Sequence, residues 1–125
     1  MFPPFFTRLS AVVTLVPAAL LVGAAPPGRA AANEPRLIEI HARKFSYFPS
    51  ELTLRKGQTY KLHLTSDDVP HSLRITALSF KAPMQPNEFN DVLFTPNQAG
   101  DFKADCGIYC GMGHKTMLLT IHVVE

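Results

Sequence analysis

The sequence predicts an all-β protein built as a two-sheet sandwich. Seven short runs of β-type or alternating residues are separated by turn residues. No stretch has a helical period, and 11 prolines in 125 residues count against a helical bundle. Apolar residues make up 46% of the chain, which is enough for one modest core.

The expected strands follow one another at short intervals along the chain. Residues 60–65 alternate most clearly, with Tyr60, Leu62 and Leu64 on one face, and the last strand alternates in the same way. We expect strands at residues 37–41, 51–55, 60–65, 71–76, 89–95, 101–105 and 117–123. Residues 78–90 contain Pro83 and Pro86, and we expect a loop there.

Residues 1–32 have the pattern of a secretory signal peptide. Arg8 precedes an apolar run from 9 to 25, and Ala30 and Ala32 provide an Ala-x-Ala end. An uncleaved membrane anchor is the alternative, although the run is short for a span and holds Pro17. We expect cleavage, which leaves a mature domain at residues 33–125. Removing Arg8 and Arg29 reduces the 12 Lys plus Arg to 10, equal to the 10 Asp plus Glu, so we expect no nucleic-acid partner.

Residues 106–117 concentrate groups that bind soft metals. This run holds both cysteines of the chain, Cys106 and Cys110, together with His114 and Met117. Thiolate and thioether favour copper, and imidazole also suits it. A second histidine must come from elsewhere, and His71 is the best candidate because Pro70 restrains the chain just before it.

The spacing Cys-x3-Cys-x3-His-x2-Met, preceded by Asp-Val-Pro-His-Ser at residues 68–72, resembles the copper domain of cytochrome c oxidase subunit II. It is also similar to the CuA domain of nitrous oxide reductase. The resemblance covers about residues 50–125 and implies a Greek-key β-sandwich of the cupredoxin type holding two copper ions. It implies that Cys106 and Cys110 are bridging thiolates and that His71 and His114 are terminal ligands. It also implies two weak ligands, the thioether of Met117 and the main-chain carbonyl of Ile108.

Together with the signal-peptide pattern, the resemblance predicts an exported, periplasmic electron carrier. The implied ligand set has no open substrate position, so we expect no bond chemistry from this protein alone. Its partner would be a redox protein, either a cytochrome or a terminal oxidase. Oxidase subunits carry two membrane helices before this domain and a tryptophan near the cytochrome c docking surface. This chain has one short apolar segment and no Trp, which favours a stand-alone form. There are two alternatives. The first is an accessory subunit of a membrane oxidase, which would associate with the membrane through that complex or through the N-terminal segment. The second is a copper chaperone or store.

Two other sites fit the same residues. Two cysteines in a small exported domain often form a disulfide, here between Cys106 and Cys110. A mononuclear blue-copper site needs only Cys110, His114, Met117 and His71, and it would leave Cys106 spare.

The remaining polar and aromatic residues are expected to be structural. Surface or pairing roles are expected for three strand histidines, His41, His63 and His122. Core or edge packing is expected for three aromatic residues, Phe45, Tyr47 and Phe48, with an electron-entry patch as the alternative. Packing as soft fillers is expected for Met84 and Met112, with Met112 lining the loop as the alternative. Solvated turn positions are expected for three acids, Asp67, Asp68 and Asp105, although these acids could instead tune the site or meet a basic partner. No catalytic triad, carboxylate pair or phosphate-binding loop is visible.

Overall fold

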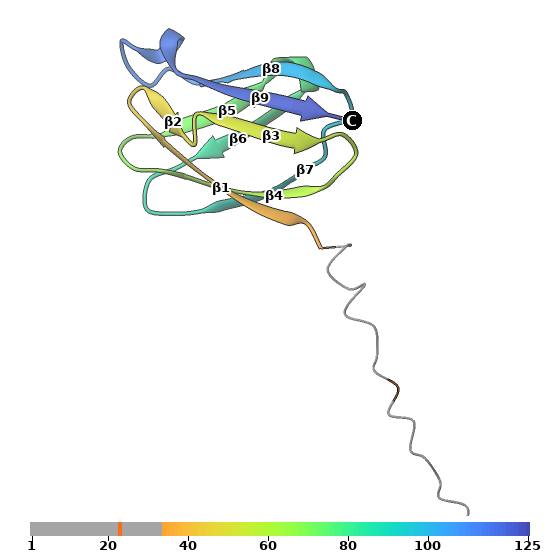
Figure 1. Cartoon of the computed structure of the whole chain (residues 1–125). Coiled ribbons are helices and arrows are strands. Elements are labelled where there is room, and N and C mark those ends of the chain that lie inside the picture. Colours follow the sequence, from red (N-terminus) through yellow and green to blue (C-terminus); the bar gives the residue numbers. More distant parts are fainter. Residues whose placement is uncertain (1–22, 24–33) are drawn as a thin grey trace, which may run out of the picture.

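Two β-sheets pack face to face in the computed structural model, which describes residue 23 and residues 34–125 (Figure 1). The first sheet has four strands in the order β2 (Ser46–Phe48), β1 (Arg36–Arg43), β4 (Tyr60–Ser66) and β7 (Asn90–Phe94). The second sheet has five strands in the order β3 (Glu51–Arg55), β9 (Leu118–Val124), β8 (Gly100–Asp105), β5 (His71–Ile75) and β6 (Phe80–Met84). The expected all-β sandwich is confirmed.

Strands that follow one another along the chain often lie in different sheets. β1 pairs in parallel with β4, and β3 pairs in parallel with β9, whereas the other pairs are antiparallel. Such crossovers between the sheets are the Greek-key feature of sandwiches and join distant segments into one core. They also bring β5 beside the end of β8, where Arg74 is paired with Asp105.

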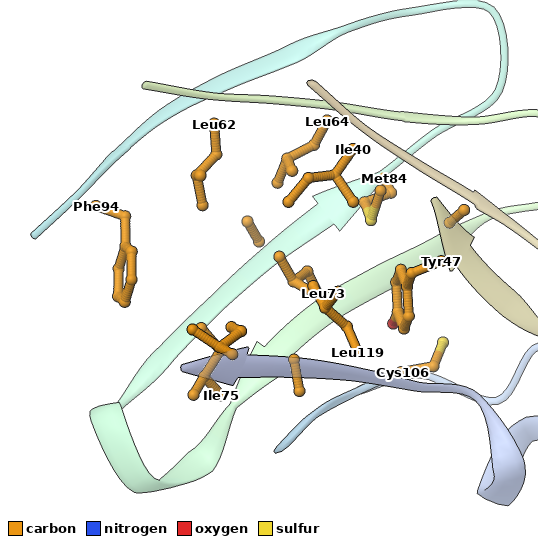
Figure 2. Close-up of a cluster of buried hydrophobic side chains, with 14 of the residues drawn as sticks. Ile40, Tyr47, Leu62, Leu64, Leu73, Ile75, Met84, Phe94, Cys106 and Leu119 are labelled. Carbon is orange, nitrogen blue, oxygen red and sulfur yellow. The ribbon is translucent and has the colours of Figure 1, made fainter. Parts of the chain in front are cut away.

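The core lies between the two sheets, and the alternating residues of each strand fill it. Tyr60, Leu62 and Leu64 are buried along β4, as their alternation predicts. Figure 2 shows the aliphatic side chains of both sheets meeting in the middle, with Tyr47 and Cys106 at the same end of the cluster. Met84, which was expected to pack in the core, is fully buried.

The prediction of a loop at residues 78–90 is wrong for the first half of that range. A 3₁₀ helix at Thr76–Leu78 turns the chain, and Phe80–Met84 then forms β6 against β5. Pro83 is exposed and lies on a strand at the edge of its sheet, so its missing N–H does not break a central ladder. The three-residue strand β2 was also not expected, because it is too short to have a recognisable period.

The cysteine-containing segment forms the connection from β8 to β9, with a 3₁₀ helix at His114–Thr116. It lies at the end of the sandwich opposite the C-terminus (Figure 1). Among the residues that the structure describes, no helix is long and apolar enough to cross a membrane. The signal segment expected at residues 1–32 falls outside them, apart from Gly23.

Candidate metal centre

The two cysteines lie side by side under the β8–β9 loop. Cys106 follows the last residue of β8, and Cys110 lies in the middle of the loop; both are buried, and both are free thiols. One nitrogen of His71 and the two sulfur atoms all lie within 4.8 Å of one another. Residues far apart in the sequence therefore provide one compact group of soft donors.

His71 is the first residue of β5 and is fully buried, so the surrounding side chains restrict the orientation of its ring. Its Nε2 donates a hydrogen bond to Oδ1 of Asp68 at 2.8 Å, and its Nδ1 lies 3.9 Å from Sγ of Cys106. The carboxylate thereby fixes the tautomer with the proton on Nε2. Nδ1 is left as the lone-pair donor, and it faces the sulfur atoms.

The other predicted ligands surround the two sulfur atoms. The carbonyl oxygen of Ile108 lies 3.1 Å from Sγ of Cys106. Nδ1 of His114 and Sδ of Met117 lie 3.8 Å and 3.9 Å from Sγ of Cys110. All six groups that the sequence singles out therefore gather at one end of the sandwich.

The surroundings shift the pKa of the Cys110 thiol and that of the Asp68 carboxylate in opposite directions. Burial, together with the neighbouring Cys106 thiol, raises the pKa of Cys110 to about 11, so this group is protonated at neutral pH until a metal displaces the proton. Burial opposes ionisation of Asp68, but the amides of Lys44 and Val69 and the His71 ring outweigh it and lower the pKa to about 2. Asp68 is therefore a permanent negative charge behind the histidine.

A second layer of contacts ties the loop to the sandwich. The N–H of Gly107 donates to Oγ of Ser72 at 2.7 Å, and the carbonyl of Ser72 accepts a 2.5 Å hydrogen bond from the Tyr47 hydroxyl. Burial and the nearby Cys106 raise the pKa of Tyr47, so its phenol stays a neutral donor. These bonds run from β2 through β5 to the loop and hold its first turn in place.

The ring of Phe45 fixes the second half of the loop. A Cβ built on Gly113 would lie 2.4 Å from Cδ2 of Phe45, and one on Gly111 would lie 2.9 Å from the same ring. Only a residue without a side chain fits at these positions, and Gly111 also has a φ of 136°. The loop therefore sits directly on an aromatic side chain from the turn between β1 and β2.

The donor set fits a soft metal ion. Bonds of about 2.0–2.3 Å from sulfur and nitrogen place two ligands of one ion roughly 3.3–4 Å apart, which is the spacing seen here. Two thiols, two imidazoles and a thioether match the preference of copper. Within residues 34–125, every buried side-chain nitrogen and oxygen atom has a hydrogen-bond partner.

The residues set aside in the sequence behave as expected with two exceptions. The strand histidines bind acids on the surface, as a pairing role predicts: His41 with Glu39 and Asp67, His63 with Asp91, and His122 with Asp101 and Glu51. Met112 is 96% exposed and does not pack as a filler, because its backbone belongs to the outer part of the loop.

The acids are the second exception, because none of the three near the loop is merely solvated. Asp67 binds His41, Asp68 binds His71, and Asp105 forms two hydrogen bonds of 2.8 Å and 2.7 Å with the Arg74 guanidinium. Their partners lie far away in the sequence or across a turn, so composition alone does not reveal them. The supporting roles of Tyr47 and Phe45 beside the loop were likewise missed, since core or edge packing is the default expectation for such an aromatic group.

Comparison with known proteins gives a consistent assignment. Residues 32–124 match the family described as cytochrome c oxidase subunit II, periplasmic domain. A cytochrome c oxidase subunit 2 of Thermus thermophilus is 30% identical over 88 residues, which cover 70% of this chain and 65% of that protein. The chain therefore spans somewhat less than two thirds of this relative's length.

Solved structures agree with the sandwich fold. The periplasmic domain of cytochrome oxidase subunit II from Bradyrhizobium japonicum superposes with a TM-score of 0.65 at 19% identity, covering 72% of this chain and 84% of that one. Auracyanin A, a "blue" copper protein from Chloroflexus aurantiacus, superposes with a TM-score of 0.58 at 19% identity, covering 73% and 100%. The architecture is of the cupredoxin type.

Proposed function

Because this chain belongs to the family of periplasmic domains of cytochrome c oxidase subunit II, we propose that it is an exported electron-transfer protein with a two-copper site of the CuA type. The observation that carries the proposal is the gathering of His71, Cys106 and Cys110 into one buried group, with His114 and Met117 beside it. Cys106 and Cys110 would hold both ions, and each ion would take one histidine, His71 or His114.

The shape of the donor set favours two ions over one. His114 is near Cys110 but does not join the compact group formed by His71 and the two sulfur atoms. The two imidazoles therefore lie against different sulfur atoms, with Nδ1 of His71 at 3.9 Å from Sγ of Cys106 and Nδ1 of His114 at 3.8 Å from Sγ of Cys110. A mononuclear site leaves Cys106 spare, yet this thiol lies inside the compact group. Two thiolates and one histidine for each ion satisfy both observations.

The chain's own residues prepare the site and close it. Cys106 and Cys110 give up their protons on binding, and Asp68 holds the His71 ring so that Nδ1 faces inward. Met117 and the Ile108 carbonyl would complete the ligand set, which would leave no position for a substrate. Copper supplies a one-electron couple, and the protein therefore transfers electrons without catalysing bond chemistry alone.

The same features favour a carrier over a chaperone or store. Ligands from β5 and from the β8–β9 loop meet only in the folded sandwich, so releasing metal requires opening it. The partner is a redox protein, a cytochrome or a terminal oxidase. The location is the periplasm, reached through cleavage of the signal segment after Ala32. Mass spectrometry of the exported protein tests that cleavage, because retention of residues 1–32 would make them an anchor.

Metal analysis with absorption and electron paramagnetic resonance tests the site itself. The mature domain, refolded with copper, is expected to bind two ions per chain with a mixed-valence spectrum. Cys106→Ser is expected to abolish this spectrum, whereas His122→Gln, a matched surface variant, leaves it unchanged. One ion with a single intense blue band would establish the mononuclear site instead. A disulfide that excludes copper would establish a purely structural role for the cysteines.

Competition with a chelator separates the carrier from the store. A copper-loaded carrier is expected to keep its metal in the presence of a strong Cu(I) chelator until urea unfolds it, while exchanging electrons rapidly with a cytochrome. Fast metal transfer from the folded protein, with slow electron exchange, would contradict the carrier. Co-purification with a membrane oxidase would identify the protein as an accessory subunit.

A further inference from the structure

A shallow hollow of about 330 Å³ opens on the surface beside the candidate metal centre. Lys44 forms one wall, Val69 and Pro70 form another, and loop residues 108–111 complete it. Cys110, one of the proposed ligands, is among the lining residues, so the hollow leads to the donor set. A group seated in it would be separated from the metal by very little protein.

The surroundings of the hollow are apolar and exposed. Tyr109 is 76% exposed and Met112 is 96% exposed, and Ile108 is also on the surface. Large apolar side chains that cluster on one exposed loop indicate a contact surface. Their place over a redox site indicates contact with a redox partner.

Three lysines surround this loop without acidic partners. Lys44 lines the hollow, Lys115 follows His114 in the loop, and the side chain of Lys81 lies against Gly107, where its Cε would be 3.0 Å from a Cβ. Within residues 34–125, the lysines that form ion pairs with carboxylates are Lys56 and Lys61. The ammonium groups at the loop are therefore available to a partner.

The acids at the same end are already engaged within the chain. Asp67 binds His41, Asp68 binds the His71 ring and two backbone amides, and Asp105 binds the Arg74 guanidinium in a two-point contact. A carboxylate held this way offers little to a second protein, and its charge is already balanced or solvated by its own partners. The surface over the loop therefore presents an apolar centre with positive charges around it.

We propose that this surface, formed by Ile108, Tyr109, Met112, Lys44, Lys81 and Lys115, docks a redox protein whose contact face carries carboxylates around an apolar centre. The proposal rests on the proposed electron-transfer function and specifies its partner. One electron passes from the partner's reduced centre to the oxidised copper site, and no bond or proton is exchanged. Opposite charges at the rim accelerate the encounter, while the apolar centre holds the complex.

One cytochrome in two charge forms provides the test. Native lysine-rich cytochrome c and the same protein after succinylation, which converts its surface ammonium groups into carboxylates, are each reduced and mixed with the oxidised copper-loaded domain in a stopped-flow instrument. At low ionic strength, the succinylated form is expected to react at least about tenfold faster, and about 0.5 M salt is expected to remove most of that difference. A faster reaction with the native cytochrome, or rates that salt does not change, would overturn the proposal.

Charge-matched variants locate the effect on the surface. The variant Lys44→Gln, Lys81→Gln, Lys115→Gln is expected to lose most of the preference for the acidic cytochrome. A control triple at the far end of the sandwich, Arg36→Gln, Arg55→Gln, Lys56→Gln, is expected to keep it. Equal losses in both triples would mean that net charge alone steers the reaction, and the docking surface would be wrong.

Copper measurements distinguish a failure of the docking surface from a failure of the proposed electron-transfer function. Copper content and the absorption spectrum are recorded before every kinetic run. A domain that holds no copper contradicts the proposed function, whereas a normal spectrum with the reverse charge preference contradicts the docking surface alone. Single variants Lys44→Gln and Lys81→Gln replace the triple if it loads copper poorly, and each is expected to lose part of the preference.

Discussion

Adding one methyl group at Gly113 tests whether Phe45 positions the metal-binding loop. Gly113 has a φ of −86°, so alanine suits its backbone and the effect of the substitution is steric. The new Cβ would lie 2.4 Å from Cδ2 and 2.5 Å from Cγ of Phe45, more than 1 Å inside an ordinary carbon contact of about 3.5–4.0 Å. Overpacking of this kind costs about 1–3 kcal/mol, so Gly113→Ala is expected to lower the unfolding free energy by that amount.

Removing the ring should remove the penalty. A fully buried Phe→Ala change costs about 3–5 kcal/mol, and Phe45 is only partly buried, so Phe45→Ala alone is expected to cost roughly 2 kcal/mol. In the Phe45→Ala background, Gly113→Ala is expected to cost less than about 0.5 kcal/mol. The coupling from the double-mutant cycle is the difference between the two Gly113→Ala costs, about 0.5–3 kcal/mol.

The assay is urea unfolding of the reduced, metal-free domain, followed by circular dichroism at constant m-value. Gly57→Ala is the control, because a Cβ at Gly57 would meet no atom within 4 Å, although the φ of this residue is 79°. Its cost comes from the left-handed backbone and is expected to be the same with or without Phe45. A Gly113→Ala penalty that persists unchanged in the Phe45→Ala background would refute the reasoning, and so would the absence of any penalty.

Three further changes probe the supports of the site and the surface histidines. Asp68→Asn is expected to weaken copper binding about 10–100-fold without changing the number of ions, measured by chelator competition, because it removes the charge that orients His71. Tyr47→Phe is expected to cost about 1–3 kcal/mol of unfolding free energy in urea, because the Ser72 carbonyl loses its buried donor; an unchanged midpoint would contradict this role. The acids around His41 and His122 raise both histidine pKa values, so the folded state binds more protons than the unfolded chain. The resulting stabilisation is complete below pH 6.5 and is lost as the pH rises through the raised pKa values. Urea midpoints measured between pH 6 and 9 are expected to show this decline, and the double variant His41→Gln, His122→Gln is expected to remove it.

Local patterns were sufficient for most of the strands and for identifying the soft donors that lie together at one end of the sandwich. Alternation along β4 and β9 identifies the buried face correctly, since one face of each strand must meet the core. The soft donors of the β8–β9 loop are adjacent in the sequence, so their chemistry is visible without a structure. β6 was missed because Pro83 normally indicates a loop, and only the sheet order reveals that it lies on an edge strand.

The supports of the site could not be predicted in the same way. Phe45 precedes Gly113 by 68 positions, and their contact exists only because β1 and β2 carry the ring to the end of the second sheet. Arg74 and Asp105 are likewise joined by the pairing of β5 with β8. The sequence favours a solvated turn position for Asp105, whereas the fold pairs it with Arg74 and leaves lysines as the available charges. The sign of the docking surface therefore depends on tertiary pairing rather than on composition.

The supports also bear on how the protein handles copper. Asp68 orients His71, the Tyr47–Ser72–Gly107 chain fixes the start of the loop, and Phe45 fixes its second half. These contacts restrain the donors of the proposed site, so little rearrangement is expected when the site changes charge. A loop held on three sides suits electron transfer, which is fastest where geometry changes least between the oxidised and reduced states. A protein that must hand its metal to another benefits from the opposite arrangement, a ligand loop that opens easily.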